Sequence, residues 1–423
     1  MDNVDFSQYV KPGDFVVCGQ GAAEPVTLLE DLLAHRHNVG TFNLFLGLSL
    51  TETVKPEHCD VVSVSSLGGF GTNWRLSKAG VLNVLPIDLS DVPDMIGASV
   101  LPVDVVLVQV AGPDAEGNYS LGLVADYLQP AIAAARTVIA EVNPSAPFTH
   151  GETTISREQI DVIVTSRKPP VYSESASIAK TDEDLAEYVV DRIPDGATIQ
   201  IGIGSAPNAI LSRLRDHRDI GFHSGVLTDA MAELMRLGVA TGGRKSIDKG
   251  LAVTGALLGT QDLYDFAHEN KAIAMRSVEY THNHAVLRQM DELVSINSAL
   301  EVDLTGQVNA EMANGVHVGA VGGQAAFVRA GSRSRRGFSV IALRSTARKG
   351  TVSRITPQLN SGVVTTSRSD VDLVATEFGV ADMRGASLEE RAKRLIGIAH
   401  PQFREELRRQ CERPDERRIA IDS

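Results

Sequence analysis

The chain of 423 residues has only three cysteines, Cys18, Cys59 and Cys411. They are odd in number, far apart and form no Cys-x-x-Cys pair, so the sequence predicts neither a disulfide framework nor a zinc site. The first residues lack the basic start and apolar run of a signal peptide, and the most apolar stretch, 100–111, is broken by a proline and an aspartate. We therefore expect a cytoplasmic protein with reduced thiols and no membrane partner.

Positive charge is in deficit over the chain as a whole. Lysine and arginine number 40 against 53 aspartates and glutamates, which gives a net charge of -13. Such a protein repels nucleic acid and anionic membranes, so neither is an expected partner. Hydrophobic residues (43%) and charged residues (22%) have the ordinary proportions of a globular protein. Because the length exceeds what one hydrophobic core usually organises, we expect two domains.

Short apolar runs rich in Val, Ile and Leu predict strands buried on both faces, as in parallel sheets. Helical patterns at 182–192 and 207–215 lie between such runs, and this alternation is typical of the crossover helices of an α/β fold. We therefore predict open, mostly parallel sheets. The runs are 15–18, 104–110, 137–142, 161–165, 198–201, 338–343 and 371–375.

The chain begins the same kind of unit twice. Segments 19–29 and 202–211 each follow an apolar run and contain Gly-x-Gly, small residues, a proline and an amphipathic helical pattern. Proline suits the first turn of a helix because its missing N–H is not needed there. Pro169 and Pro170 favour an extended connector between the two units. We predict two similar α/β domains, an N-terminal one at 1–180 and a C-terminal one at 181–423.

Two glycine-rich turns are candidate ligand sites. Gly202 and Gly204 follow a predicted strand, where backbone N–H groups and a helix N-terminus can face an anion or a developing oxyanion. Gly322 and Gly323 lie in a second cluster of small residues, which lets the main chain approach a ligand closely. Turns of this kind also serve close packing alone. Neither is a P-loop, and neither has the complete dinucleotide fingerprint.

A positive stretch without aspartate or glutamate follows the second glycine cluster. In an acidic protein it is a candidate phosphate site, because guanidinium groups bind phosphate in a bidentate manner. The alternative is a solvated face whose charges pair with acids elsewhere in the fold. Its basic residues are Arg329, Arg333, Arg335, Arg336, Arg344, Arg348, Lys349 and Arg354.

The sequence contains no known arrangement of catalytic or metal-binding residues. There is no Ser-His-Asp order, and His282 and His284 are two apart without a third metal ligand, so we interpret them as ordinary polar residues. No metal and no resident cofactor are expected. Carboxylates in polar or glycine-rich surroundings remain as candidate catalytic groups, with an unpaired surface acid as the alternative for each. They are Glu24, Glu152, Asp229, Glu311 and Glu377.

Several motifs along the chain carry a more specific signal. The longest is INSALEVDLTGQVN at 296–309, followed by VGGQ at 321–324. The others are GPDAEG at 112–117, GTVSRI at 350–355, TEFGVA at 376–381 and IAHP at 398–401. Together they resemble the acetyl-CoA hydrolase/transferase family, which includes 4-hydroxybutyrate and acetate CoA-transferases. The resemblance covers nearly the whole chain.

The resemblance implies two open α/β domains of the CoA-transferase type and a ping-pong reaction. In such enzymes a glutamate attacks the acyl-CoA to give an acyl-glutamyl anhydride. The CoA thiolate then returns to form a glutamyl thioester, which passes CoA to a second carboxylate. In many relatives this glutamate follows a His-Thr or His-Ser pair, but the matching stretch FHSGVLTD at 222–229 has Gly225 in its place. Another carboxylate must then act, or the chemistry differs, or the protein only binds CoA esters.

From the resemblance we predict transfer of CoA between an acyl-CoA thioester and a short-chain carboxylic acid. Acyl-CoA hydrolysis and silent acyl-CoA binding are the alternatives. CoA is then a substrate, the partners are acyl-CoA and small carboxylic acids, and a homo-oligomer is expected. We place the ligand between the domains, with both glycine turns on one side and Glu24 with the 68–69 loop on the other. The predicted catalytic residues are Glu311, Gly322 and Gly323, and the predicted CoA-binding residues are Gly202, Gly204, Asn208, Asn297, Gln324, Lys349 and Arg354.

Overall fold

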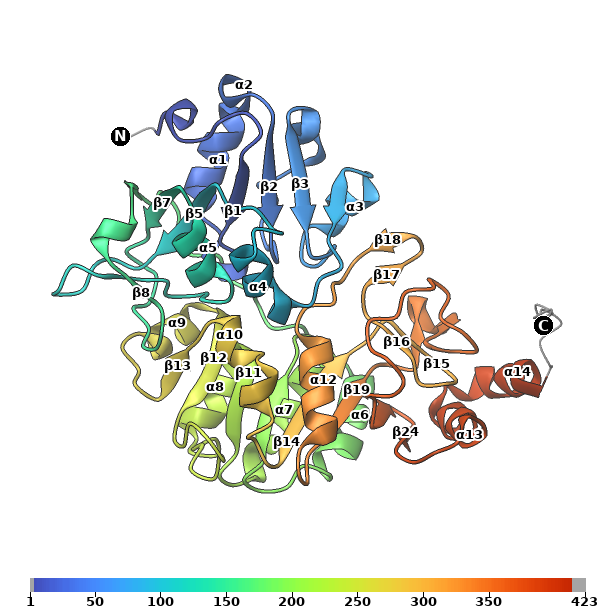
Figure 1. Cartoon of the computed structure of the whole chain (residues 1–423). Coiled ribbons are helices and arrows are strands. Elements are labelled where there is room, and N and C mark those ends of the chain that lie inside the picture. The colour runs from blue at the N-terminus through green and yellow to red at the C-terminus, as the bar shows by residue number, and fades with distance from the viewer. Residues whose placement is uncertain (1–3, 413–423) are drawn as a thin grey trace.

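The computed structural model describes residues 4–412. Figure 1 shows two bodies, one coloured blue to teal and the other green to orange, with a pair of red helices beside the second. Each body contains one large sheet, and four small sheets complete the fold. None of the helices in the described range combines the length and the apolar character that a membrane crossing requires.

The first large sheet has seven parallel strands in the order β4-β3-β2-β1-β5-β7-β9. Side chains alternate between its faces, so Val16 packs with α1 on one side while Val17 packs with α4 and α5 on the other. This double covering explains why every residue of β5 is buried. The strands are β1 Phe15–Cys18, β2 Phe42–Leu46, β3 Val62–Ser66, β4 Leu82–Val84, β5 Val105–Val110, β7 Thr137–Val142 and β9 Val162–Thr165.

The second large sheet has eight strands in the order β13-β12-β11-β10-β14-β19-β23-β24, and only its last strand is antiparallel to its neighbour. Its strands are β10 Thr198–Ile201, β11 Gly221–Thr228, β12 Ala252–Leu258, β13 Ile273–Met275, β14 Leu293–Ser298, β19 Phe338–Ala342, β23 Leu373–Thr376 and β24 Gly379–Asp382.

The remaining strands form small sheets. They are β6 Tyr119–Ser120 with β8 Thr154–Ile155, then β15 Glu301–Asp303 with β16 Val308–Asn309 and β22 Ile355–Thr356, then β17 Met312–Ala313 with β18 Val316–His317, and β20 Thr346–Ala347 with β21 Val352–Ser353. The helices are α1 Val26–Ala34, α2 Arg36–Val39, α3 Trp74–Lys78, α4 Val92–Gly97, α5 Leu128–Ala134, α6 Lys180–Val190, α7 Ser205–Ser212, α8 Asp229–Arg236, α9 Gln261–Ala267, α10 Val278–Thr281, α11 His284–Leu287, α12 Gln324–Arg333, α13 Leu388–Ile398 and α14 Pro401–Glu412.

The two large sheets share one topology. In each, the first strand lies in the middle, the next three follow on one side in sequence order, and the later strands follow on the other side. The predicted pair of similar, mostly parallel α/β domains is therefore confirmed. All seven apolar runs contain a strand, and the two helical patterns correspond to α6 and α7.

The connector between the sheets, residues 166–179, contains no helix or strand and ends where α6 begins. Main-chain bonds also join the two bodies elsewhere, because Ala125 N donates to Gly255 O (2.9 Å) and Leu257 N donates to Leu123 O (2.8 Å). The β17–β18 hairpin reaches from the second body toward α3 of the first (Figure 1), where His317 N donates to Ser77 Oγ (3.1 Å). The exact boundary near residue 180 stays a prediction.

Candidate active site

The candidate site lies at the carboxyl end of the second sheet. There β10 is flanked by β11 on one side and β14 on the other, which is the switch point where open α/β sheets form a ligand crevice. The second turn, as we call residues 202–207, leads from β10 into α7. Ile203 at its tip is 53% exposed, and Gly204 is the residue directly before the helix. The structure therefore places Gly202 and Gly204 in an open strand-to-helix turn.

Beneath the second turn, Asn297 is held in a buried network of amides and hydroxyls. Its Nδ2 donates to Gln200 Oε1 (3.0 Å) and to Ser295 Oγ (3.0 Å), and its Oδ1 accepts from Gln200 Nε2 (3.2 Å). Asn208 on α7 donates from Nδ2 to Ala176 O of the connector (3.5 Å). Both predicted CoA-binding amides are thus engaged with the protein itself, and they fix the position of the turn.

A cavity of about 340 Å³ opens beside the second turn and contains Arg344 and Arg354. Arg344 forms a bidentate ion pair with Asp182, with Nε to Oδ1 at 2.8 Å and Nη2 to Oδ2 at 2.5 Å. Burial alone would raise the pKa of Asp182, but the Arg344 guanidinium and further hydrogen bonds hold it below its usual value. The charge of Arg344 is therefore already balanced within the protein.

Arg354 lines the same cavity with most of its donors unused. Its Nη1 donates to Ala299 O at 3.3 Å, and its Nε is buried without a partner within residues 4–412. Burial lowers the pKa of this guanidinium, and the nearby Arg344 adds to the effect. An anion with several acceptor oxygens would satisfy these donors. Arg354 is therefore the basic residue best placed to bind a phosphate.

The rest of the basic stretch is divided between paired and exposed side chains. Arg348 and Lys349 are exposed. The other arginines pair with acids elsewhere in the fold, which is the alternative that the sequence left open for this stretch. The pairs are Arg329 and Arg333 with Asp370, Arg335 with Asp291, Arg336 with Glu292, and Arg344 with Asp182.

The second glycine cluster, residues 319–323, contacts the first domain before α12 begins. Gly69 N donates to Gly319 O (2.9 Å), and Leu89 N donates to Gly322 O (2.9 Å). These bonds bring the 68–69 loop against the glycine cluster, so loops of both domains meet at the carboxyl end of the second sheet. The position of the cluster therefore depends on the first domain.

The main chain of Gly322 forms a bridge to Asp88, in which Gly322 O accepts from Leu89 N (2.9 Å). The Gly323 N–H donates to no acceptor in the described part of the chain. A Cβ atom added at Gly322 would meet nothing within 4 Å, so open space lies beside it. Gln324 begins α12, and its Nε2 donates to Thr366 Oγ1 (3.1 Å). A free N–H at a helix N-terminus next to open space suits a developing oxyanion.

His282 occupies the space between Gly225 and Gly323. A Cβ atom added to Gly225 would lie 3.1 Å from His282 Cε1 and Nε2, and one added to Gly323 would lie 2.2 Å from Nε2. The ring packs on Phe327 of α12 with 4.7 Å between ring centroids, and the residue is 2% exposed. A glutamate at position 225 would therefore require His282 to move. Gly225 itself is partly exposed.

Thr281 Oγ1 lies 2.8 Å from His282 Nδ1 and 3.1 Å from Ser277 O, so Nδ1 is held by a hydrogen bond whichever of the two atoms donates. Among the described residues, no hydrogen bond involves His282 Nε2. Burial lowers the pKa of His282 to about 3, so the ring is neutral near pH 7. The sequence analysis, which interpreted His282 as an ordinary polar residue, did not predict its position beside Gly225.

The candidate carboxylates are each held by partners within the protein. Glu311 accepts from Thr365 Oγ1 (2.7 Å), and among the described contacts none joins its carboxylate to Gly322 or Gly323. Its main-chain oxygen, however, accepts from Gly319 N (2.9 Å) at the start of the glycine cluster. The role of Glu311 as nucleophile stays a prediction. The other carboxylates are Glu24, which accepts from Leu50 and Thr51, Glu152, which pairs with Arg276, Asp229, which accepts from Thr260, and Glu377, which accepts from Ser345.

The first turn, as we call residues 19–25 between β1 and α1, is filled by its own side chains. The Glu24 carboxylate is 4% exposed and accepts from Thr51 Oγ1 (2.6 Å), Thr51 N (3.2 Å) and Ser49 Oγ (3.2 Å). Burial raises the pKa of Glu24, although these hydrogen bonds oppose the effect. The Glu24 carboxylate is therefore bonded to groups of the first domain.

Asp126 is a buried acid at the contact between the domains that sequence reasoning did not find. Gln20 of the first turn donates from Nε2 to Asp126 Oδ2 (2.5 Å), while Asp126 Oδ1 is buried without a partner in residues 4–412. Its main-chain oxygen accepts from Val278 N of the second domain (3.1 Å). Burial raises the pKa of Asp126 to about 7, and the Gln20 hydrogen bond only partly offsets this.

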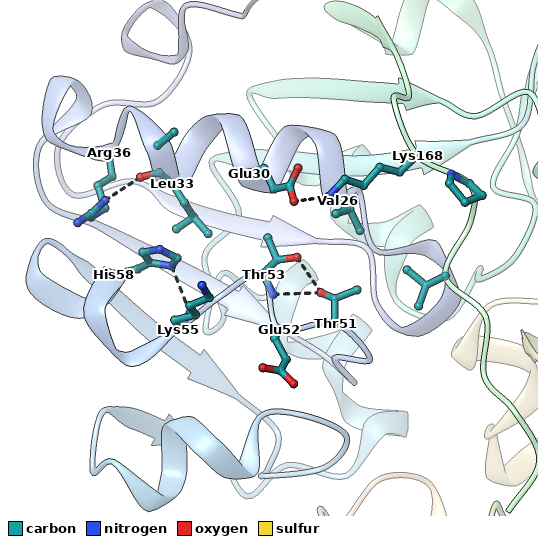
Figure 2. A pocket seen from close by; sticks show the side chains of 13 residues that line it. Val26, Glu30, Leu33, Arg36, Thr51, Glu52, Thr53, Lys55, His58 and Lys168 are labelled. Atoms are coloured by element: carbon teal, nitrogen blue, oxygen red, sulfur yellow. Dashed lines mark hydrogen bonds and ion pairs between the residues drawn. The ribbon is translucent and has the colours of Figure 1, made fainter.

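A larger cavity of about 610 Å³ lies in the first domain, between α1 and the loop before β3. Figure 2 shows its basic side chains, of which Lys168 points to Glu30 and Arg36 to the main chain of Leu33. Arg36 also pairs with Asp60 (2.8 Å). None of the predicted site residues lines this cavity. Because its cations are mostly paired, the cavity beside the second turn is the better candidate for an anionic ligand.

Comparison with known families identifies the family of the chain. Two family models match the chain, the acetyl-CoA hydrolase/transferase N-terminal domain over residues 2–172 and the C-terminal domain over residues 259–411. The chain belongs to the acetyl-CoA hydrolase/transferase family. In this family member, the second turn lines the cavity with Arg354, while His282 lies against both Gly225 and Gly323.

Individual relatives of this family member match it over almost its full length. The 4-hydroxybutyrate coenzyme A transferase of Clostridium kluyveri is 38% identical over 93% of this chain and 92% of its own. The succinyl-CoA:cyclohexane-1-carboxylate CoA transferase of Geobacter metallireducens is 35% identical over 96% and 93%. Among solved structures, RipA from Yersinia pestis has a TM-score of 0.91 at 33% identity and covers 96% of this chain and 95% of its own.

Proposed function

We propose that the protein transfers CoA between an acyl-CoA thioester and a short-chain carboxylic acid. The family supports this function, as do relatives named CoA transferases that match over more than nine-tenths of both chains. One observation in the site carries the proposal. Arg354 lines the cavity beside the second turn and makes a single hydrogen bond to the main chain among the described residues, so its remaining Nη hydrogens can bind a phosphate of CoA.

The thioester end of the bound CoA lies near the Gly323 N–H in this proposal. That N–H donates to no protein acceptor in the described residues, so it can stabilise the oxyanion formed when the thioester carbonyl is attacked. Since Gly225 offers no carboxylate, the acceptor acid itself attacks the carbonyl carbon. The carbon–sulfur bond breaks and gives a mixed anhydride and the CoA thiolate. The thiolate then attacks the acyl carbon of the acceptor, and the donor acid leaves.

The test is an exchange assay with the full chain. Butyryl-CoA is incubated with acetate, and the appearance of acetyl-CoA is followed by mass spectrometry. We expect a new CoA ester that increases with both substrates to saturation, without an acyl or CoA adduct on the protein. CoA binding without exchange toward any of a series of short-chain acids would reject the proposal. A glutamyl-CoA adduct on Glu311 would keep the function but replace the direct attack.

Assembly as a homo-oligomer and a cytoplasmic location are further parts of the proposal. The thiols support a reducing compartment, because Cys18, Cys59 and Cys411 are all free and Cys18 is buried. Light scattering of the purified chain measures its oligomeric state. A molar mass equal to that of one 45.2 kDa chain would reject the oligomer.

A further inference from the structure

The Asp126 carboxyl of the first domain occupies the place that a side chain at Gly255 in β12 would take. A Cβ atom added at Gly255 would lie 2.4 Å from Asp126 Oδ1. The next atoms around that point are Gly225 O at 3.2 Å and Arg276 O at 3.6 Å. Since β11, which contains Gly225, is the neighbour of β12 in the second sheet, the carboxyl lies close to the position where the glutamate of other family members is missing.

The protonation state of Asp126 decides whether its Oδ1 can form a hydrogen bond. Oδ2 accepts from Gln20 Nε2 (2.5 Å), but Oδ1 is buried without a partner within residues 4–412. An ionised Oδ1 has the main-chain oxygens of Gly225 and Arg276 as neighbours, which is unfavourable for a buried charge. A protonated Oδ1 can donate to one of these oxygens. Burial raises the pKa of Asp126 to about 7, in accord with this geometry.

The titratable groups on the elements around Asp126 do not stabilise its ionised form. They are Cys18, Glu24, Tyr127, His223, Arg276, Glu279, Tyr280 and His282. Burial raises the pKa of the thiol and of both phenols and lowers the pKa of each imidazole to about 3, so all five are neutral near pH 7. The Arg276 guanidinium is balanced by an ion pair with Glu152. None of these groups therefore offers an uncompensated positive charge to the Asp126 carboxyl.

Asp126 also joins the two domains through its main chain, and this contact leads to the candidate site. Its main-chain oxygen accepts from Val278 N (3.1 Å) at the start of α10. At the end of this helix, Thr281 Oγ1 lies 2.8 Å from His282 Nδ1, and the His282 ring lies against Gly323. Asp126 has a φ of 27°, a strained conformation that persists only where the surrounding contacts impose it. A continuous set of contacts thus connects Asp126 with the Gly323 N–H.

We propose that protonated Asp126 is a positioning residue for CoA transfer, which holds α10 and the strand of Gly225 in the geometry that the site needs. The proposal rests on the proposed function, because that transfer is the reaction it controls. When Asp126 loses its proton, the buried charge moves β12 and α10 away from the first domain. His282 and the Gly323 N–H then lose their alignment, and attack on the thioester slows. Binding of the CoA phosphates beside Arg354 does not depend on this contact.

The experiment measures kcat and KM for transfer from butyryl-CoA to acetate in the full chain, between about pH 6 and about pH 8.5. Asp126→Asn is the test variant, because its amide has the shape of the protonated acid, can donate a hydrogen bond and cannot ionise. Asp372→Asn is the matched control. Asp372 is also a buried acid whose pKa is raised by burial, but it lies directly before β23, at the amino end of the second sheet.

We expect kcat of the native chain to be about 30-fold lower at about pH 8.5 than at about pH 6, because only a small fraction of Asp126 then keeps its proton. KM for butyryl-CoA changes little. In Asp126→Asn, kcat at the higher pH stays within about twofold of its value at the lower pH. Asp372→Asn keeps the native profile.

Three results would overturn the proposal. They are a flat profile in the native chain, a native-like profile in Asp126→Asn, and a pH effect confined to KM. If Asp126→Asn does not fold, hydrogen–deuterium exchange of the native chain decides. The amides of residues 276–281 should then exchange more readily at about pH 8.5 than at about pH 6, after correction for the intrinsic rates. Equal protection at both pH values would reject the role of Asp126.

The failure of this proposal can be distinguished from the failure of the proposed function. Absence of CoA transfer at every pH would reject the proposed function, and hydrogen–deuterium exchange would still test the contact at Asp126. Transfer that does not depend on the protonation of Asp126 would reject only the present inference.

Discussion

In both domains a glycine turn follows the central strand and leads into a helix, with Pro25 directly before α1 and Pro207 in the first turn of α7, but different groups fill the two turns. In the first turn, the Glu24 carboxylate accepts hydrogen bonds from the hydroxyls of Ser49 and Thr51. The Gln20 side-chain amide donates to the buried carboxyl of Asp126. The second turn has no such side chains. Ile203 is exposed at its tip, and a cavity with an incompletely bonded Arg354 adjoins it.

The difference shows how one motif serves two purposes after duplication. A glycine turn at the switch point of an open sheet is a ligand site only when the chain leaves it unfilled. In the first turn, Glu24 accepts hydrogen bonds from buried donors, so this turn stabilises the fold. Small residues in the second turn keep it accessible. The comparison can be tested by changing residues of each turn and measuring stability and CoA affinity separately.

The largest effect is expected for Glu24→Ala in the first turn. The change leaves several buried donors around Ser49 and Thr51 without an acceptor, and we expect the free energy of unfolding to fall by about 4 kcal/mol. Urea unfolding followed by circular dichroism measures it. The control is Glu30→Ala on the same helix, whose exposed ion pair with Lys168 contributes about 1 kcal/mol or less. A loss of CoA affinity without loss of stability would mean that the first turn binds ligand too.

The next effect concerns the Asp126 carboxyl that Gln20 of the first turn holds. Its pKa in the folded state is about 7, against 3.8 for an unperturbed aspartate. A raised pKa means that the folded state prefers the protonated acid, so the contribution of Asp126 to stability is greatest below about pH 4 and falls as the pH rises to about 7. We expect Asp126→Asn to be more stable than the native chain by about 3 kcal/mol at about pH 8, and the difference to vanish near pH 4. Urea unfolding at both pH values measures it, and an equal difference at both would contradict the assignment.

A smaller effect is expected for Arg354→Ala beside the second turn. Loss of charge-assisted hydrogen bonds to a phosphate should weaken CoA binding by about 30-fold, while binding of the free acid is unchanged. Isothermal titration calorimetry measures both. Arg335→Ala is the control, because this arginine pairs with Asp291 at the surface. Equal losses for CoA and free acid, or none for either, would place the phosphates elsewhere.

The smallest effect is expected for Lys349→Ala, which the sequence also assigned to CoA binding. Lys349 is exposed and does not line the cavity. Its charge acts through solvent, so we expect the Kd for CoA to rise by about threefold at low salt and by less at high salt. A loss as large as that of Arg354→Ala would show that CoA extends over the β20–β21 turn.

The α/β fold and its duplication could be predicted from the sequence, because strands buried in a parallel sheet consist of continuous runs of Val, Ile and Leu. The runs around β5 and β10 are clear for this reason. β11 was not predicted, since FHSGVLT mixes polar and small residues with apolar ones. That mixture follows from the site, where Gly225 and Val226 face partly exposed space.

The site itself was predicted less completely than the fold. The glycine turns and Arg354 could be found because their composition is unusual for an acidic chain. His282 could not, because its importance comes from the missing side chain of Gly225, and only folding brings the two together. Asp126 was not predicted for a similar reason, since the residues near it in sequence do not indicate that it is buried between the domains.

The contact between the glycine cluster and the first domain uses main-chain atoms, with Gly69 N donating to Gly319 O. Most side chains of these loops can therefore change during evolution without loss of the contact. Gly68, Gly69 and Gly319 are exceptions, because added Cβ atoms would lie 2.2 Å from Gly319 O, 1.8 Å from His317 O and 2.0 Å from Ala310 O, respectively. Chimeras that join the first domain of one relative to the second domain of another should thus keep a working site wherever these glycines are retained. Diversity in acceptor acids can then arise by exchanging whole domains.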